Sequence, residues 1–165
     1  MNEITELFRK LTVGVYVVGV AHGEQRDAFT AAWVMQISFE PLLLALSVNP
    51  DNASYPLLRA GGGFTVNVLR QGQLESARRF GTQSGRDQDK LAGIGWRRGH
   101  KGAPILDDAV AYFDCVLTAS MQSGDHELVF GRVIDGRILA PEARPLTYAE
   151  TGDMDGSSAL YPTRF

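Results

Sequence analysis

Segments with the composition of β-strands recur at short intervals along this sequence. They cover residues 11–21, 28–34, 41–48, 64–69, 109–122 and 126–139. Short polar stretches join several of them, which is typical of antiparallel hairpins. A doubly wound α/β fold would need helices of about ten residues or more between its strands, and only two intervals of this chain are long enough. The pattern therefore predicts a mainly β protein, an antiparallel barrel or sandwich with short inserted helices.

The inserted helices and the tail complete this outline. Apolar residues recur at helical spacing in residues 3–10 and 72–81, and the glycines at 61–63 are expected to stop a third short helix. Residues 82–104 have the composition of a long loop. Residues 146–165 are expected to form an extended C-terminal arm that packs across a neighbour. We expect residues 1–165 to form a single domain.

Composition and charge exclude several classes of protein. The chain has 165 residues, of which 44% are hydrophobic and 21% charged, and its formal net charge is −3. Because the basic residues are dispersed, nucleic acid is not an expected partner. The longest apolar run, residues 41–48, is too short to cross a bilayer, and the N-terminus lacks the apolar region of a secretory signal. We therefore expect a cytoplasmic protein with no membrane partner.

The common motifs for nucleotide, metal and hydrolase sites are broken or absent. In GGGFTV, Val66 replaces the last glycine of the dinucleotide fingerprint, and in HELVF, Phe130 stands where a zinc protease has its second histidine. His22 and His100 lie in separate polar segments, so no metal site is expected. Cys115, the only cysteine, is more consistent with a small buried residue than with a nucleophile. This pattern favours an enzyme whose reactive atoms belong to a cofactor.

The order of the segments resembles the flavin reductase-like family, which comprises FMN-binding split-barrel proteins and includes the small reductase components of two-component monooxygenases. The resemblance covers almost the whole chain. The segments that carry it are LTVGVYVVGV, DAFTAAWVMQISFEPLLLALSV, NPDNASYPLL, FTVNVL, ESARRFG, DKLAG and GDHELVFGRV. It implies that the β-structure is an antiparallel split β-barrel with short inserted helices.

The same resemblance implies where a flavin would bind. Small residues in the segment TAAW would let backbone N–H groups approach the isoalloxazine ring, and the segment SVNPDNAS would contact ribityl hydroxyls and phosphate near a helix start. One of the two arginines in SARRFG would meet the phosphate. The implied cofactor-binding residues are Thr30, Ala31, Ala32, Trp33, Gln36, Ser47, Val48, Asn49, Asn52, Ser54, Arg78, Arg79 and Phe80.

His126, in the turn GDH, is the implied catalytic-site residue. In the family this turn lies beside the flavin, so His126 would position the flavin or the incoming nicotinamide, and hydride transfer itself needs no general base there. The alternative is a structural histidine whose hydrogen bonds are satisfied within the protein.

The implied activity is an NAD(P)H-dependent flavin oxidoreductase, which transfers hydride from NADH or NADPH to FMN or FAD and supplies reduced flavin to a partner such as a monooxygenase. The resemblance also implies a homodimer. The alternative is a non-catalytic FMN-binding electron-transfer protein. The family commonly has T-x-x-S-F where this chain has TAAWV, beginning at Thr30, and this departure leaves the choice between FMN and FAD open.

Overall fold

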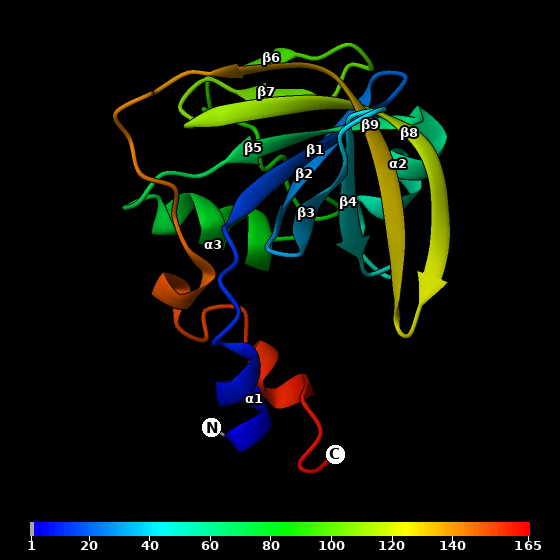
Figure 1. The fold of residues 1–165 in the computed structure, drawn as a ribbon. Coiled ribbons are helices and arrows are strands. Elements are labelled where there is room, and N and C mark those ends of the chain that lie inside the picture. The colour runs from blue at the N-terminus through cyan, green and yellow to red at the C-terminus, as the bar shows by residue number, and fades with distance from the viewer. Residues whose placement is uncertain (1) are drawn as a thin grey trace.

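Nine strands form the framework of the structure, a computed structural model that describes residues 2–165 (Figure 1). Seven of them make one sheet in the order β2-β1-β5-β8-β9-β4-β3, and β6 and β7 make a separate pair. The strands are β1 (Tyr16–His22), β2 (Gln25–Ala31), β3 (Val34–Ser38), β4 (Leu43–Val48), β5 (Gly63–Val68), β6 (Trp96–Arg98), β7 (Pro104–Leu106), β8 (Ala111–Ser123) and β9 (His126–Ile138).

All pairings between these strands are antiparallel. The large sheet curves strongly but its edge strands, β2 and β3, are not paired with each other, so the barrel stays open (Figure 1). The prediction of a mainly β, antiparallel split barrel with short helices is confirmed. The long hairpin β8–β9 turns at Gly124, whose φ of 65° favours glycine.

Two α-helices are inserted among the strands, a third precedes them, and two 3₁₀ helices follow them. They are α1 (Glu3–Phe8), α2 (Tyr55–Gly61), α3 (Leu74–Thr82), η1 (Tyr148–Thr151) and η2 (Ser157–Leu160). Helix α2 ends at Gly62, whose left-handed φ of 66° lets its N–H bond to the carbonyl of Leu58. The glycine stop expected at residues 61–63 is therefore confirmed.

Strand β1 is buried on both faces because the sheet is covered on each side. Val18 and Val20 belong to a first core cluster inside the barrel, where Leu58 of helix α2 covers them. Val17 belongs to a second cluster outside the barrel, with Phe80 of helix α3. These two clusters place α2 and α3 on opposite faces of the sheet and hold the ends of β2 and β4 in position.

The structure differs from the sequence expectations in three segments. Residues 28–34 do not form one strand, because a turn at Ala32, whose carbonyl accepts from the N–H of Val34, separates β2 from β3. The expected loop 82–104 contains β6 and the first residue of β7, strands too short to leave a pattern in the sequence. The tail is not extended, since it forms η1 and η2 and contacts the chain's own helix α1 beside it (Figure 1).

Candidate functional site

A cavity of about 240 Å³ lies where strand ends meet the C-terminal segment. Its walls come from the end of β2 with the following turn, the end of β4 with its turn, the first residue of β9, and residues 148–160. Nine of the sequence-predicted site residues meet here. The lining residues are Phe29, Thr30, Ala31, Ala32, Trp33, Ser47, Val48, Asn49, Asn52, His126, Tyr148, Asp155, Ser157 and Leu160.

Small side chains form the part of the wall that comes from β2. Thr30, Ala31 and Ala32 are partly exposed to the cavity, and the hydroxyl of Thr30 donates to the carbonyl of Ala77 in helix α3 at 2.8 Å. Since that bond fixes the end of β2 against α3, the backbone is presented as a rigid surface. Trp33 is 52% exposed at the rim of the cavity.

The turn after β4 supplies polar groups. The N–H of Ser47 donates to the carbonyl of Trp33 at 3.0 Å, so the two turns are held together. The side-chain oxygen of Asn49 accepts from the N–H of Asp51 at 2.9 Å, and that of Asn52 accepts from the N–H of Ser54 at 3.0 Å. Because these bonds fix the orientation of the two amides, the NH₂ groups remain as donors that these asparagines can offer to a ligand.

His126 begins β9 at the opposite side of the cavity. Its Nδ1 lies 2.7 Å from a carboxylate oxygen of Asp125, whose pKa is lowered by that hydrogen bond. The imidazole ring lies 5.0 Å from the Trp33 ring, centroid to centroid, with the planes inclined by 52°. The ring thus contacts both Asp125 and Trp33, which suits a positioning role.

The other five predicted residues do not line this cavity. Gln36 is exposed on edge strand β3, and Arg78 is exposed on α3. Ser54 is buried and donates its hydroxyl to Asp27 at 2.6 Å. Arg79 donates to the carbonyl groups of Lys90 and Ala92, and Phe80 packs in the second core cluster. The side chains of Ser54 and Arg79 are therefore committed to structural contacts, and Phe80, which was expected to bind the cofactor, is a core residue.

A second cavity, of about 230 Å³, adjoins the first and shares Phe29, Thr30 and Asn52 with it. It contains Lys90, whose side chain is only 3% exposed and whose ammonium lies 3.3 Å from a carboxylate oxygen of Asp27. The sequence segment DKLAG belongs to the resemblance, but sequence reasoning assigned no role to its lysine. A buried cation beside an open cavity is the signal that only the fold reveals.

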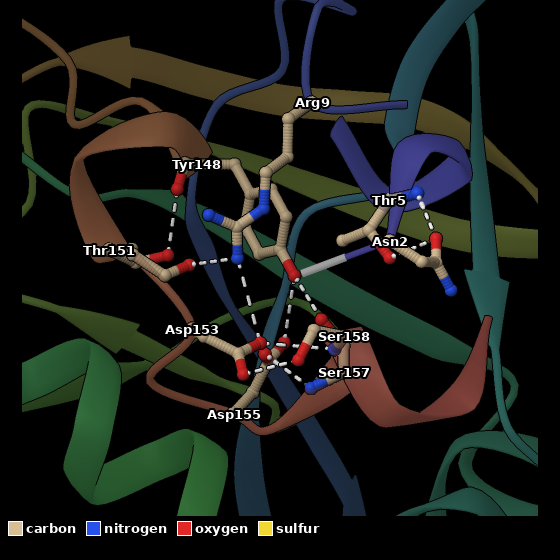
Figure 2. Close-up of polar contacts among 10 residues, drawn as sticks. Asn2, Thr5, Arg9, Tyr148, Thr151, Asp153, Asp155, Ser157 and Ser158 are labelled. Atoms are coloured by element: carbon tan, nitrogen blue, oxygen red, sulfur yellow. Dashed lines mark hydrogen bonds and ion pairs between the residues drawn. The ribbon is translucent and has the colours of Figure 1, made fainter. Parts of the chain in front are cut away.

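The C-terminal segment forms a wall that sequence reasoning also missed. Tyr148, Asp155, Ser157 and Leu160 all line the first cavity. Figure 2 shows the hydroxyl of Tyr148 between Asp155 and Ser157, at 3.0 Å and 2.7 Å respectively. Burial raises the pKa of the Tyr148 phenol, so this hydroxyl keeps the proton that it donates to Asp155.

The described part of the chain contains neither a cluster of metal ligands nor a membrane-spanning helix. Within residues 2–165, no group of three or more His, Cys, Asp or Glu side chains is arranged to hold a metal ion. None of the helices in those residues is long and apolar enough to cross a membrane.

Comparison with known proteins identifies the family. The chain is similar to high molecular weight rubredoxin from Moorella thermoacetica, with 34% identity over 88% of this chain, and it spans only 64% of that protein. It is 33% identical to the reductase subunit HsaB of a flavin-dependent monooxygenase from Mycobacterium tuberculosis, over 87% of this chain and 75% of that one.

Among solved structures, the NADH:FAD oxidoreductase SgcE6 of Streptomyces globisporus superposes with a TM-score of 0.81 and 29% identity, over 88% of this chain and 86% of that one. SgcE6 also has a structure with NAD and FAD fragments. The family model for the flavin reductase like domain matches residues 8–157. The chain therefore belongs to the flavin reductase-like family.

Proposed function

We propose that this protein is an NAD(P)H-dependent flavin oxidoreductase. The observation that carries the proposal is the joining of two cavities: one walled by small residues and a held histidine, the other containing a buried cation. A flat heterocycle with an anionic tail needs that combination. Similarity to a monooxygenase reductase subunit and to an NADH:FAD oxidoreductase supports the same activity.

The donor groups present fit FMN, with FAD as the alternative. The isoalloxazine ring would occupy the first cavity, where Thr30, Ala31 and Ala32 let backbone N–H groups approach it. The ribityl chain would pass Asn52, which borders both cavities, and the phosphate would meet Lys90 in the second. Lys90 replaces Arg78 and Arg79 as the proposed phosphate partner, because it lines the second cavity, whereas neither arginine lines either cavity.

When bound, the flavin supplies the acceptor for a hydride from the nicotinamide of NADH or NADPH. The residues of this chain bring the two rings together and surround them with donors, which lowers the barrier through proximity and through stabilisation of developing negative charge. His126, held by Asp125 and Trp33, positions the nicotinamide over the flavin. No proton transfer at His126 is required.

We also propose that the protein is a homodimer and that it supplies reduced flavin to a monooxygenase component. Large apolar side chains are exposed along and beside edge strand β3: Met35 is 62% exposed, Ile37 39% and Phe39 87%. Such a row of exposed apolar side chains supports an interface with a second copy. Sedimentation at micromolar concentration should give twice the chain mass, and replacing Phe39 by Asp should give the monomer.

A second candidate is a non-catalytic FMN-binding electron-transfer protein, favoured by the similarity to a protein named as a rubredoxin. Anaerobic titration of the flavin-loaded protein with NADH and then NADPH separates the two. Bleaching of the flavin absorbance by either nucleotide supports the reductase. Retention of an oxidised flavin with both nucleotides would refute it and support the second candidate.

The position of the phosphate has its own test. Replacing Lys90 by Met should weaken FMN binding at least about tenfold, because a phosphate ion pair is lost, but should leave riboflavin, which has no phosphate, within about twofold. Equal losses for FMN and riboflavin would refute the assignment of Lys90, since they would indicate a general disturbance of the cavity.

A further inference from the structure

The wall of the flavin cavity formed by the C-terminal segment has open space on both sides. Tyr148 and Ser157 line the first cavity and also a third one, of about 190 Å³, whose other walls are mostly apolar residues of the N-terminal segment. Because neither face of this wall is closely packed, dispersion contacts hold it less firmly than they would hold a core element. Its position therefore depends on specific bonds.

Within itself the segment is well bonded. Asp153 accepts from the N–H and the hydroxyl of Ser158, at 3.0 Å and 2.5 Å, and Asp155 accepts from the N–H of Ser157 at 3.0 Å (Figure 2). These bonds join residues at most five positions apart, so they shape the turn but do not attach it to the barrel.

Part of the attachment comes from the two residues that cap helix α1. Arg9, just after α1, donates from Nη2 to the carbonyl of Gly152 at 2.9 Å and lies 3.5 Å from a carboxylate oxygen of Asp153, with its side chain 19% exposed (Figure 2). Asn2 donates to the carbonyl of Pro162 at 3.1 Å. Met154 packs on the second core cluster, and in the described residues 2–165 the other polar bonds from residues 151–162 to the rest of the chain are those to Tyr148.

We propose that Arg9 is a positioning residue for flavin: through Gly152 and Asp153 it holds the turn that carries Asp155 and Ser157 against the flavin cavity. This inference rests on the proposed function, because the ligand held in that cavity is the flavin. Arg9 lines only the third cavity, so it acts through the wall and does not itself line the flavin cavity. Helix α1 thus supports a binding site assembled elsewhere in the fold.

The test compares Arg9→Ala with Arg9→Lys and, as the matched control, Lys10→Ala, which removes a neighbouring exposed cation. The dissociation constant of FMN is measured by fluorescence, and kcat is measured at saturating FMN and NADH. Arg9→Ala should raise the FMN dissociation constant about fivefold to tenfold, in keeping with one charge-assisted bond, and leave kcat within about twofold. Arg9→Lys should recover most of the affinity, and Lys10→Ala should behave as wild type.

The inference would be overturned if the Arg9→Ala protein bound FMN as tightly as wild type, or if it lost affinity and kcat by the same factor. In either case, flavin reduction by the wild-type protein would still support the proposed function. A wild-type protein that binds neither FMN nor FAD would overturn both. If Arg9→Ala does not fold, Asp153→Asn tests the same contact from the other side. It should raise the dissociation constant about twofold to threefold, and an unchanged value would count against Arg9.

Discussion

Replacing Lys90 by Met tests the buried ion pair that borders the flavin cavity. Lys90 and Asp27 have side chains only 3% and 9% exposed, and their charged atoms are 3.3 Å apart. Asp27 also accepts from the N–H of Ala28 at 2.8 Å and from the hydroxyl of Ser54 at 2.6 Å. Methionine keeps the unbranched apolar stem of lysine, so the substitution removes the charge with little loss of packing.

The expected loss in the free energy of unfolding follows from this geometry. Removing one partner of a buried pair costs about 3–5 kcal/mol, because the other charge is left uncompensated. Asp27 keeps two hydrogen bonds, which places Lys90→Met at the lower end, about 3 kcal/mol. Asp27→Asn should cost a similar amount, since it leaves the Lys90 ammonium buried without its charged partner. The double variant contains neither charge and should lose only about 1 kcal/mol, since buried pairs contribute little net stability.

Urea unfolding of the four proteins, followed by fluorescence, gives the free energy of each and the coupling between the two sites. Lys10→Met, at an exposed position, is the control and should stay within about 0.5 kcal/mol of wild type. If Lys90→Met lost less than about 1 kcal/mol, or if the double variant lost the sum of the single losses, the pair would not be a coupled buried contact and this reasoning would be wrong.

Three further predictions concern His126, Cys115 and Asp114. His126→Ala should slow flavin reduction in stopped flow more than it weakens flavin binding, and equal losses in both would contradict the positioning role. Burial raises the pKa of the Cys115 thiol to about 12, so the native protein should not react with a disulfide reagent at about pH 8 and should react on unfolding; rapid native labelling would argue against that burial. Burial also raises the pKa of Asp114, despite the N–H of His100 that bonds to it. Protonated Asp114 therefore stabilises the folded protein. This contribution is fully present below the pKa of the unfolded state, about 3.9, and is lost as the pH rises through the higher pKa of the folded state. Asp114→Asn should therefore gain stability relative to wild type between about pH 4 and pH 7, and parallel stability curves would refute this.

Local composition was sufficient for much of the fold and for part of the site. Runs of valine, leucine and aromatic residues between short turns predict antiparallel strands because the pleated backbone and its hairpins are local structures. The small residues after Thr30 and the asparagines after β4 lie at strand ends, and the structure brings both groups to the cavity as the order of segments predicts. His126 joins them because it begins the strand β9 that pairs with β4.

The roles of other residues depend on partners far away in the chain, which local pattern does not reveal. Ser54 seemed suited to a phosphate, but its hydroxyl bonds to Asp27, 27 positions earlier. Lys90 lies in a polar segment typical of a solvated loop, yet the fold buries it beside a cavity. Residues 148–160 have the composition of a tail, and they become a cavity wall through partners far away in the chain, among them Arg9, which is 143 positions from Gly152.

The sequence by itself determined most of the strands, their antiparallel pairing and the small residues at the strand ends, since backbone sterics and side-chain periodicity act between near neighbours. Only the tertiary structure decided which charged and polar side chains face the cavities. That choice depends on burial, because a buried ammonium or hydroxyl must find a partner wherever the fold places one.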